Sequence, residues 1–183
     1  MNVGISMSAT PGVTDFAAVA QKIEELGFDS VWLPEHPVIP VNHNTKYAGT
    51  PDGSIPIPMT LGVNPLIALA TAASATENLG LGTAVNLVTE HNPIDLAKQI
   101  STLDFYSGGR FMFGIGTGWF REESEIMGAD FDHRWTQARE YVLAMKQLWT
   151  EEEAEYHGKY VDFPPVIMNP KPARKPHPPV YMG

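Results

Sequence analysis

The chain has 183 residues, 43% of them hydrophobic, which is enough for one buried core and too little for two large domains. Its net charge of −9, without a basic segment, argues against nucleic acid and anionic membrane surfaces as partners. The absence of cysteine excludes disulfides and thiolate metal sites and fits a reducing cytoplasm, and no segment has the ~20 apolar residues that span a bilayer. These features predict a soluble, cytoplasmic enzyme.

Short apolar runs along the chain predict β-strands. They lie at residues 2–7, 29–33, 79–85, 110–116 and 180–183. The run at 110–116 is almost unbroken, which suits a parallel strand covered on both faces rather than a strand with one wet face. Residues 37–63 are rich in proline, asparagine and glycine, and structureless loops of this length are usually functional or mobile.

Helical segments separate these strands. Thr14 is predicted to cap the first helix, and an asparagine followed by a proline opens the second at residues 64–65 and the third at 92–93. Apolar stripes predict the core-facing sides of the third and fourth helices: Ile94, Ala97, Ile100 and Leu103 in one, and Trp135, Ala138, Val142, Met145 and Trp149 in the other. Seven prolines within residues 164–179 predict an extended connection without helix.

Four successive strand–helix pairs with apolar strands predict an α/β fold built from parallel βαβ units. Two architectures fit this pattern, a doubly wound open sheet and a (β/α) barrel of the TIM type. The residues that could carry chemistry follow strand after strand, at 35–36, 86–91 and 117–119. Barrel enzymes hold their sites in loops of this kind, whereas an open sheet binds its ligand at one switch point, so the barrel is favoured.

Three glycines mark the end of the fourth strand, at Gly114, Gly116 and Gly118. Their spacing does not match the dinucleotide fingerprint GxGxxG. Two interpretations are equally good. Either a flat ligand lies against bare backbone at the carboxyl end of the strand, or the glycines permit close packing of a helix.

Three segments resemble one known family. They are GFDSVWLPEH at 27–36, LGLGTAVNLVTEHNPIDLAKQISTLDFYSGGRFMFGIGTGW at 79–119 and REYVLAMKQLWT at 139–150. Together they are similar to the luciferase-like monooxygenase superfamily, and within it to the branch that uses the deazaflavin coenzyme F420 more than to bacterial luciferase. The resemblance implies a (β/α)8 barrel that binds F420 or FMN at its carboxyl-end rim, acts on a small organic substrate and forms a homodimer.

A complete barrel of this type needs about 250 residues. The resemblance therefore implies that residues 1–183 are a single barrel domain with about four and a half of the eight βα units. Two hypotheses follow: the chain is part of a longer protein, or two copies share the contacts that a half barrel lacks. In the family a glycine pair at the end of the fifth strand begins the phosphate site, and Gly183 stands at that point.

The resemblance also implies roles for residues at the ends of the second and third strands. His36 would sit by the reactive carbon of the ring and help to position or protonate the reacting centre, a task that suits an imidazole. Glu35 would either orient His36 or only cap a loop. Thr83, Ala84 and Val85 would support the ring face, with a cis peptide bond between Ala84 and Val85.

Further cofactor contacts are implied for Asn86, at the carbonyl edge of the ring, and for Thr117, Gly118 and Trp119 after the fourth strand. Trp119 stands where some members have a glutamate proton donor. An indole can stack on substrate or ring, but it cannot donate that proton. This departure weakens the case for sugar-phosphate dehydrogenation.

Other polar residues are assigned no role in chemistry. Glu90 and His91 are predicted to be solvated loop or the lead-in to the Asn92 cap, and Glu122, Glu123 and Glu125 a wet helix face or loop. The remaining histidines show no ligand spacing, which predicts no metal site: His43, His133, His157 and His177.

The leading functional hypothesis is hydride transfer between F420 and a small organic substrate, in which the cofactor supplies the redox chemistry and the protein supplies placement. The nearest alternative is an FMN-dependent monooxygenase that uses O2. A third is a non-catalytic shortened barrel that serves as a flavin-binding or assembly module.

Overall fold

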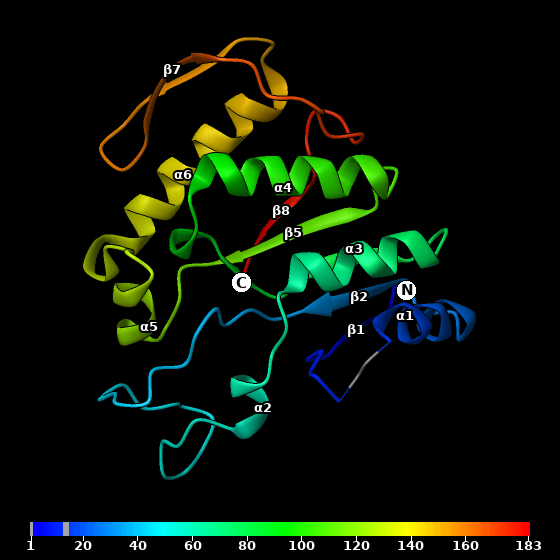
Figure 1. Cartoon of the computed structure of the whole chain (residues 1–183), viewed down its shortest axis with the longest axis vertical. Helices are drawn as coiled ribbons and strands as arrows, with labels where there is room; N and C mark the ends of the chain where they lie inside the picture. Colours follow the sequence, from blue (N-terminus) through cyan, green and yellow to red (C-terminus); the bar gives the residue numbers. More distant parts are fainter. Residues whose placement is uncertain (1, 13–14) are drawn as a thin grey trace.

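The computed structural model describes residues 2–12 and 15–183 (Figure 1). Its main sheet is parallel, with the strands Gly4–Ser6 (β1), Ser30–Leu33 (β2), Gly80–Thr83 (β3), Phe111–Gly116 (β5) and Val180–Met182 (β8). Each strand pairs with the strand before it in this order, and the two-residue β4 (Asn86–Leu87) continues beyond β3 along β5. An order without reversal is that of a (β/α) barrel wall, whereas a doubly wound sheet reverses at its switch point. The predicted fold class is confirmed, and all five predicted strands are present, each shorter than predicted.

Four long helices connect these strands: Phe16–Glu25 (α1), Pro65–Ala75 (α3), Pro93–Tyr106 (α4) and Arg134–Thr150 (α6). The predicted starts of α3 and α4 are confirmed, because Asn64 and Asn92 each accept first-turn backbone hydrogen bonds of 3.0 to 3.2 Å. At α1 the side chain of Asp15 is the observed cap, while the predicted cap Thr14 lies outside the described residues. None of the helices in the described part of the chain has the length and apolarity needed to cross a membrane.

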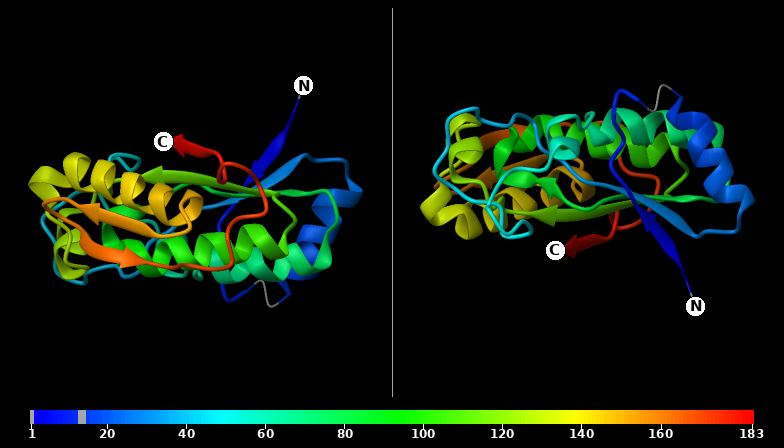
Figure 2. Two further views of the ribbon diagram at one scale, coloured as in Figure 1. Left: turned by 90° about the horizontal axis from the view of Figure 1, so that it is seen from above. Right: turned by 90° about the horizontal axis from the view of Figure 1, so that it is seen from below.

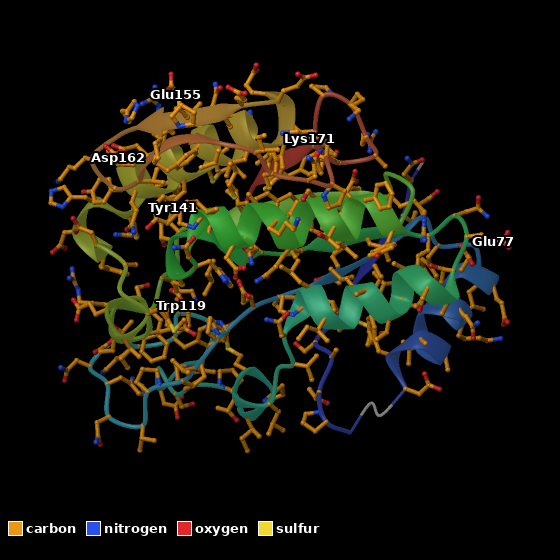
Figure 3. All side chains as sticks on the ribbon, turned by 45° about the horizontal axis from the view of Figure 1, so that its top comes forward. Glu77, Trp119, Tyr141, Glu155, Asp162 and Lys171 are labelled. Atoms are coloured by element: carbon orange, nitrogen blue, oxygen red, sulfur yellow. The ribbon has the colours of Figure 1, made fainter. Side chains whose placement is uncertain are left out.

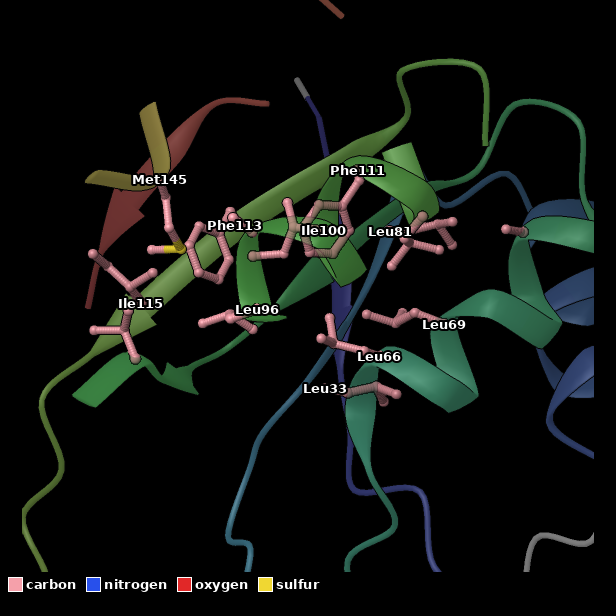
Figure 4. Close-up of a cluster of buried hydrophobic side chains, with 14 of the residues drawn as sticks. Leu33, Leu66, Leu69, Leu81, Leu96, Ile100, Phe111, Phe113, Ile115 and Met145 are labelled. Carbon is pink, nitrogen blue, oxygen red and sulfur yellow. The ribbon is translucent and has the colours of Figure 1, made fainter. Parts of the chain in front are cut away.

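The hydrophobic core lies between the sheet and the long helices. Alternate side chains of the strands point to the helices and meet apolar side chains from the helices' inner faces (Figure 4). The residues labelled in Figure 4 are all buried: Leu33, Leu66, Leu69, Leu81, Leu96, Ile100, Phe111, Phe113, Ile115 and Met145. Burial stabilises the fold by about 1.5–3 kcal/mol for each large apolar side chain, so this layer holds the helices on the sheet.

Two residues of the predicted apolar stripes lie outside the core. Ile94 is 38% exposed and Trp135 is 56% exposed, so their predicted burial is wrong. Both occupy the first turn of their helices, α4 and α6. With 3.6 residues per turn, each lies at the edge of the face that the buried residues of its helix define, not in the middle of that face.

The structure contains elements that the sequence patterns do not predict. An antiparallel hairpin of Ala154–His157 (β6) and Asp162–Val166 (β7) packs on α6. Two short helices, Ile57–Thr60 (α2) and Arg121–Ile126 (α5), lie within predicted loops, as do single 3-10 turns at Val88–Glu90 and Phe131–His133. The extended connection predicted for residues 164–179 is confirmed, since this described segment contains no helix.

The two faces of the sheet differ. Figure 2 shows α3 and α4 stacked on one face. On the other face Trp32 lies against Gly82, where a Cβ atom would overlap the indole, and its ring meets that of Tyr181 edge-on at 6.1 Å. Tyr181 is exposed, so this face is accessible at β8 in the described chain.

Candidate active site

The loops that follow β2, β3 and β5 meet at the carboxyl edge of the sheet. We call this edge the rim and define it as residues 34–38, 84–91 and 117–124. The pairing of β4 with β5 places Asn86 beside Ile115 and Leu87 beside Gly116. Trp119 marks this end of the molecule in Figure 3. The predicted site residues therefore come together from three neighbouring strands.

The end of β3 presses against β5. The peptide bond between Ala84 and Val85 is cis, as predicted, and the Thr83 hydroxyl donates a hydrogen bond to the Gly114 carbonyl (2.7 Å). A Cβ atom at Gly114 would overlap the Thr83 carbonyl oxygen, and one at Gly116 would lie 2.5 Å from Val85 Cγ2. Gly114 and Gly116 therefore make room for the end of β3 rather than for a helix, which corrects the helix-packing interpretation.

Glu90 is buried beneath Gly118, so its predicted place in a solvated loop is wrong. Only 2% of Glu90 is exposed, and the Ser124 hydroxyl donates a hydrogen bond to its Oε1 (2.8 Å). Gly118 has a φ of +77°, and a Cβ atom there would lie 3.0 Å from the same oxygen. Burial, aided by the nearby charges of Glu123 and Glu35, raises the pKa of Glu90 to about 7 against the opposing hydrogen bond from Ser124. A large share of Glu90 is therefore protonated at neutral pH.

Glu35 does not orient His36. Its Oε2 accepts hydrogen bonds from Asn86 Nδ2 (2.7 Å), the Leu87 backbone N–H (2.8 Å) and His91 Nε2 (3.0 Å). Of its two predicted roles the structure supports loop holding, because Glu35 ties the loop after β2 to the loop after β3. Burial by itself lowers the pKa of His91, but the hydrogen bond and charge of Glu35 outweigh burial and raise that pKa above its ordinary value. His91, predicted to be solvated, is thus largely buried and paired with Glu35.

His36 is paired with Glu123 of α5. Its Nδ1 lies 2.7 Å from Glu123 Oε2, and Glu123 is fully buried, so the prediction of a wet residue is wrong. The cause is the inward face of α5, on which Glu123 and Ser124 follow the N-cap residue Phe120 at the helical spacings i+3 and i+4. The buried ring of Phe120 turns that face inward. A large aromatic residue at this spacing is the signal in the sequence that could have found Glu123.

An aromatic cluster borders His36. The Trp119 ring stacks on Phe120 with ring centroids 5.0 Å apart, and the rings of Tyr47 and His36 lie 5.4 and 6.0 Å from Trp119. Tyr47 belongs to the long loop at 37–63, so this loop reaches the rim and contributes to it.

Glu122 anchors the same loop to α5. Its Oε1 accepts hydrogen bonds from the backbone N–H groups of Asn44 (2.6 Å) and Thr45 (3.1 Å). Hydrogen bonds from Thr45 and Asn44 lower the pKa of Glu122 to about 2. Of the three glutamates predicted as a wet face, Glu125 is exposed as predicted, while Glu122 is a tether.

The other predicted site residues lie on the rim as well. Thr117 is buried between Gly116 and Gly118, and Val85 is partly exposed above Gly116. Asn86 donates its amide to Glu35, and its Oδ1 is buried without a hydrogen-bond partner among the described residues. The contacts of these residues with a cofactor stay predictions.

Known proteins are similar to this chain in sequence. The sequence profile of the luciferase-like monooxygenase family matches residues 1–183. A protein of Mycobacterium tuberculosis is 42% identical over 173 residues, which are 94% of this chain and 61% of that protein. The FMNH2-dependent dimethylsulfone monooxygenase of Pseudomonas putida is 33% identical over 113 residues, which are 60% of this chain and 31% of that enzyme. The F420-dependent glucose-6-phosphate dehydrogenase of Intrasporangium calvum is 34% identical over 145 residues, which are 76% of this chain and 39% of that enzyme.

The fold is shared with solved structures. A monooxygenase from Streptomyces bottropensis matches with a TM-score of 0.81 and 26% identity, over 100% of this chain and 53% of that one. The chain spans no more than 61% of the length of any of these four proteins. The chain belongs to the luciferase-like monooxygenase family.

Proposed function

We propose that this chain provides the ring-binding half of a flavin- or deazaflavin-dependent oxidoreductase that transfers hydride between F420 and a small organic substrate. The observation that carries the proposal is the meeting, at one rim, of the buried His36–Glu123 pair and the partly exposed Val85 beside bare backbone. Family membership supports it, because relatives are named for their dependence on F420 or on FMNH2.

The surroundings of Val85 fit one face of a flat ring. Cβ atoms at Gly116 and Gly183 would lie 2.5 and 2.6 Å from the methyl carbons of Val85, so bare backbone of β5 and of the residue after β8 borders this side chain. An apolar side chain bordered by bare backbone suits the flat face of an isoalloxazine or deazaflavin ring. The cofactor that carries this ring supplies the redox chemistry when bound. The residues proposed to hold the ring are Thr83, Ala84, Val85, Asn86, Thr117, Gly118 and Trp119.

His36 is the residue proposed to handle protons. Its Nδ1 is engaged by Glu123, and its Nε2 has no hydrogen-bond partner within residues 2–12 and 15–183. Nε2 is therefore the nitrogen that can donate a proton to, or accept one from, a reacting group. The rings of Trp119 and Tyr47 border His36 and offer aromatic faces to an organic substrate. Glu35, predicted to orient His36 or to cap a loop, holds the loop that carries His36.

An FMN-dependent monooxygenase that uses O2 is the second candidate, favoured by the 33% identity to an FMNH2-dependent enzyme. Fluorescence titration with F420 and with FMN separates the two candidates. We expect saturable binding of F420 that is lost in Val85→Glu, because a carboxylate would then stand where the ring lies. Val41→Glu places the same change at a 93% exposed valine and should bind as the wild type does.

Two results would count against this order of candidates. Tighter binding of FMN, with oxygen-dependent oxidation of an organic substrate, would put the monooxygenase first. Failure to bind either cofactor would contradict the proposal as a whole and favour a non-catalytic module.

The organisation of the working protein is also a proposal. We propose that residues 1–183 are one barrel domain, completed by further chain or by a second copy, and that the protein works as a homodimer in the cytoplasm, which the absence of cysteine fits. Native mass spectrometry tests the assembly: a dimer or a longer chain agrees with it, and a well-folded monomer of this length contradicts it. Cell fractionation tests the compartment.

A further inference from the structure

We propose that Glu123 is a positioning residue, whose carboxylate holds the Nδ1 proton of His36 and so fixes the imidazole in the tautomer with a free Nε2. The inference rests on the proposed function for the task of His36. Its geometry does not depend on which cofactor binds.

The contact between the two side chains is long-range in sequence and close in space. His36 and Glu123 are 87 positions apart, and the Nδ1–Oε2 distance of 2.7 Å is that of a charge-assisted hydrogen bond. Their side chains are only 10% and 1% exposed, so water competes little for either group. The second oxygen of Glu123 accepts the backbone N–H of Val38 (3.4 Å), so one carboxylate holds both the ring and the backbone of the same loop.

The two other buried carboxylates of the rim have partners of their own. Glu35 is bonded to His91, and Glu90 accepts from the hydroxyl of Ser124. Because burial raises the pKa of Glu90 to about 7, this carboxyl is largely neutral at lower pH and repels Glu123 little there. Glu123 is thereby left free to serve the loop after β2.

The two histidine–carboxylate pairs use opposite ring nitrogens. His36 bonds through Nδ1 and His91 through Nε2. A carboxylate accepts only from a protonated nitrogen, so neutral His36 carries its proton on Nδ1 and neutral His91 carries its proton on Nε2. Asn86 Nδ2 lies 3.3 Å from His91 Nε2, but it donates to Glu35 at the shorter distance of 2.7 Å, so in this tautomer the two nitrogens share Glu35 Oε2 as their acceptor. One protein thus contains both tautomers, and each is an internal reference for the other.

Nitrogen-15 NMR of the histidine rings, on the whole chain without cofactor, tests the inference. At alkaline pH we expect Nδ1–H for His36 and Nε2–H for His91, assigned with the variants His36→Gln and His91→Gln. Glu123→Met removes the acceptor and should move the tautomer ratio of His36 about tenfold or more toward Nε2–H, with His91 unchanged. Glu125→Met, on the exposed side of the same helix, is the matched control and should change neither ratio.

The inference is overturned by a wild-type His36 that carries its proton on Nε2, or by an unchanged ratio in Glu123→Met. If Glu123→Met does not fold, the wild-type spectrum and Glu123→Gln still test whether Glu123 fixes the tautomer of His36. Glutamine keeps an oxygen acceptor without the charge, so the expected ratio is intermediate, and an unchanged ratio contradicts a role for the charge. Failure of the proposed function looks different: the expected tautomers would be present, but neither F420 nor FMN would bind.

Discussion

Two buried regions of this chain are held together in opposite ways. Between the sheet and the helices most buried side chains are apolar, as at the fully buried Phe113. At the rim, seven polar residues are at most 5% exposed: Glu35, Asn86, Thr89, Glu90, Thr117, Glu123 and Ser124. Apolar burial drives folding, whereas buried polar groups cost free energy unless each one finds a partner. The buried polar residues of the rim are therefore explained by something other than stability. Carboxyl groups with perturbed pKa values, such as that of Glu90, gather at functional sites.

The difference also says how each region responds to change. The apolar layer responds to volume, because a deleted side chain leaves a cavity. The rim responds to partners, because deleting one member of a buried pair leaves the other uncompensated. Substitutions of matched size can therefore separate the two regions experimentally.

The largest effect is expected in the apolar layer. Phe113→Ala should lower the free energy of unfolding by about 3–5 kcal/mol, measured by urea denaturation, because the ring is fully buried. The tautomer of His36 should not change. Tyr106→Ala, at a 78% exposed aromatic residue, is the control and should lie within about 0.5 kcal/mol of the wild type. A loss below about 1 kcal/mol at Phe113 would mean that this layer is not close-packed.

The next effect is a pH-dependent gain at the rim. Glu90→Gln should stabilise the chain by up to about 3 kcal/mol at alkaline pH, the cost of ionising a carboxyl whose pKa is about 7 instead of 4.5. Between these two pH values the folded chain keeps a proton that the unfolded chain has released, so wild-type stability falls as pH rises. Thermal unfolding of both proteins should show the greatest difference above pH 7 and the smallest below pH 4.5.

His91 adds a second dependence of stability on pH, with the same sign. Its raised pKa contributes stability that is present below the ordinary value of 6.5 and is lost as pH rises through the higher folded value. In Glu90→Gln the free energy of unfolding should therefore still fall somewhat as pH rises. Adding His91→Gln in a double variant should remove this remaining dependence on pH. Glu77→Gln, at an exposed position, should keep the wild-type slope. An unaltered slope in Glu90→Gln would contradict a buried neutral acid.

A smaller effect separates backbone conformation from contact at the rim. Gly118→Ala and Gly128→Ala both place a Cβ atom at a positive φ, +77° and +84°, which costs about 1–2 kcal/mol in each case. At Gly128 nothing lies within 4 Å of the added atom, whereas at Gly118 it meets Ser124 Oγ at 2.9 Å. We expect Gly118→Ala to lower the free energy of unfolding, measured by chemical denaturation, by about 1 kcal/mol more than Gly128→Ala does. Equal losses of stability in the two variants would show that neighbouring rim residues shift to accommodate the added Cβ atom.

The smallest effect is expected where the long loop meets α5. Glu122→Gln weakens the acceptor for the backbone N–H groups of Asn44 and Thr45. Their amide hydrogen exchange should quicken several-fold while the midpoint of thermal unfolding stays nearly unchanged, because the tether lies at the surface. Glu125→Gln should leave both amides as they are. Unchanged exchange in Glu122→Gln would mean that other contacts hold the loop.

Sequence patterns predict the local features of this molecule well. The apolar strands and the Asn-Pro helix starts at 64–65 and 92–93 depend on neighbouring residues, and they are where expected. The hairpin of β6 and β7 escapes prediction because its strands have four and five residues, and two adjacent prolines lie in the second.

The polar rim is harder to predict because its partners are distant in sequence. Glu123 bonds a histidine 87 residues away, and Glu90 bonds a serine 34 residues away. A glutamate in a polar segment is usually solvated, so only the meeting of three loops reveals the exceptions. The adjacency of Glu35 and His36 misleads for the same reason, since the two side chains bond to different loops.

The central claim is that the rim, and no other surface, receives the cofactor. The chain also has an apolar groove of about 720 Å³ between α3 and α4, which shares no residue with the rim. Backbone amide NMR of the labelled protein during titration with F420, and separately with FMN, distinguishes these surfaces directly. The account predicts shifts at residues 35–36, 84–86 and 116–119 for the cofactor that binds. Shifts confined to the groove between α3 and α4, or no shifts with either cofactor, would contradict it.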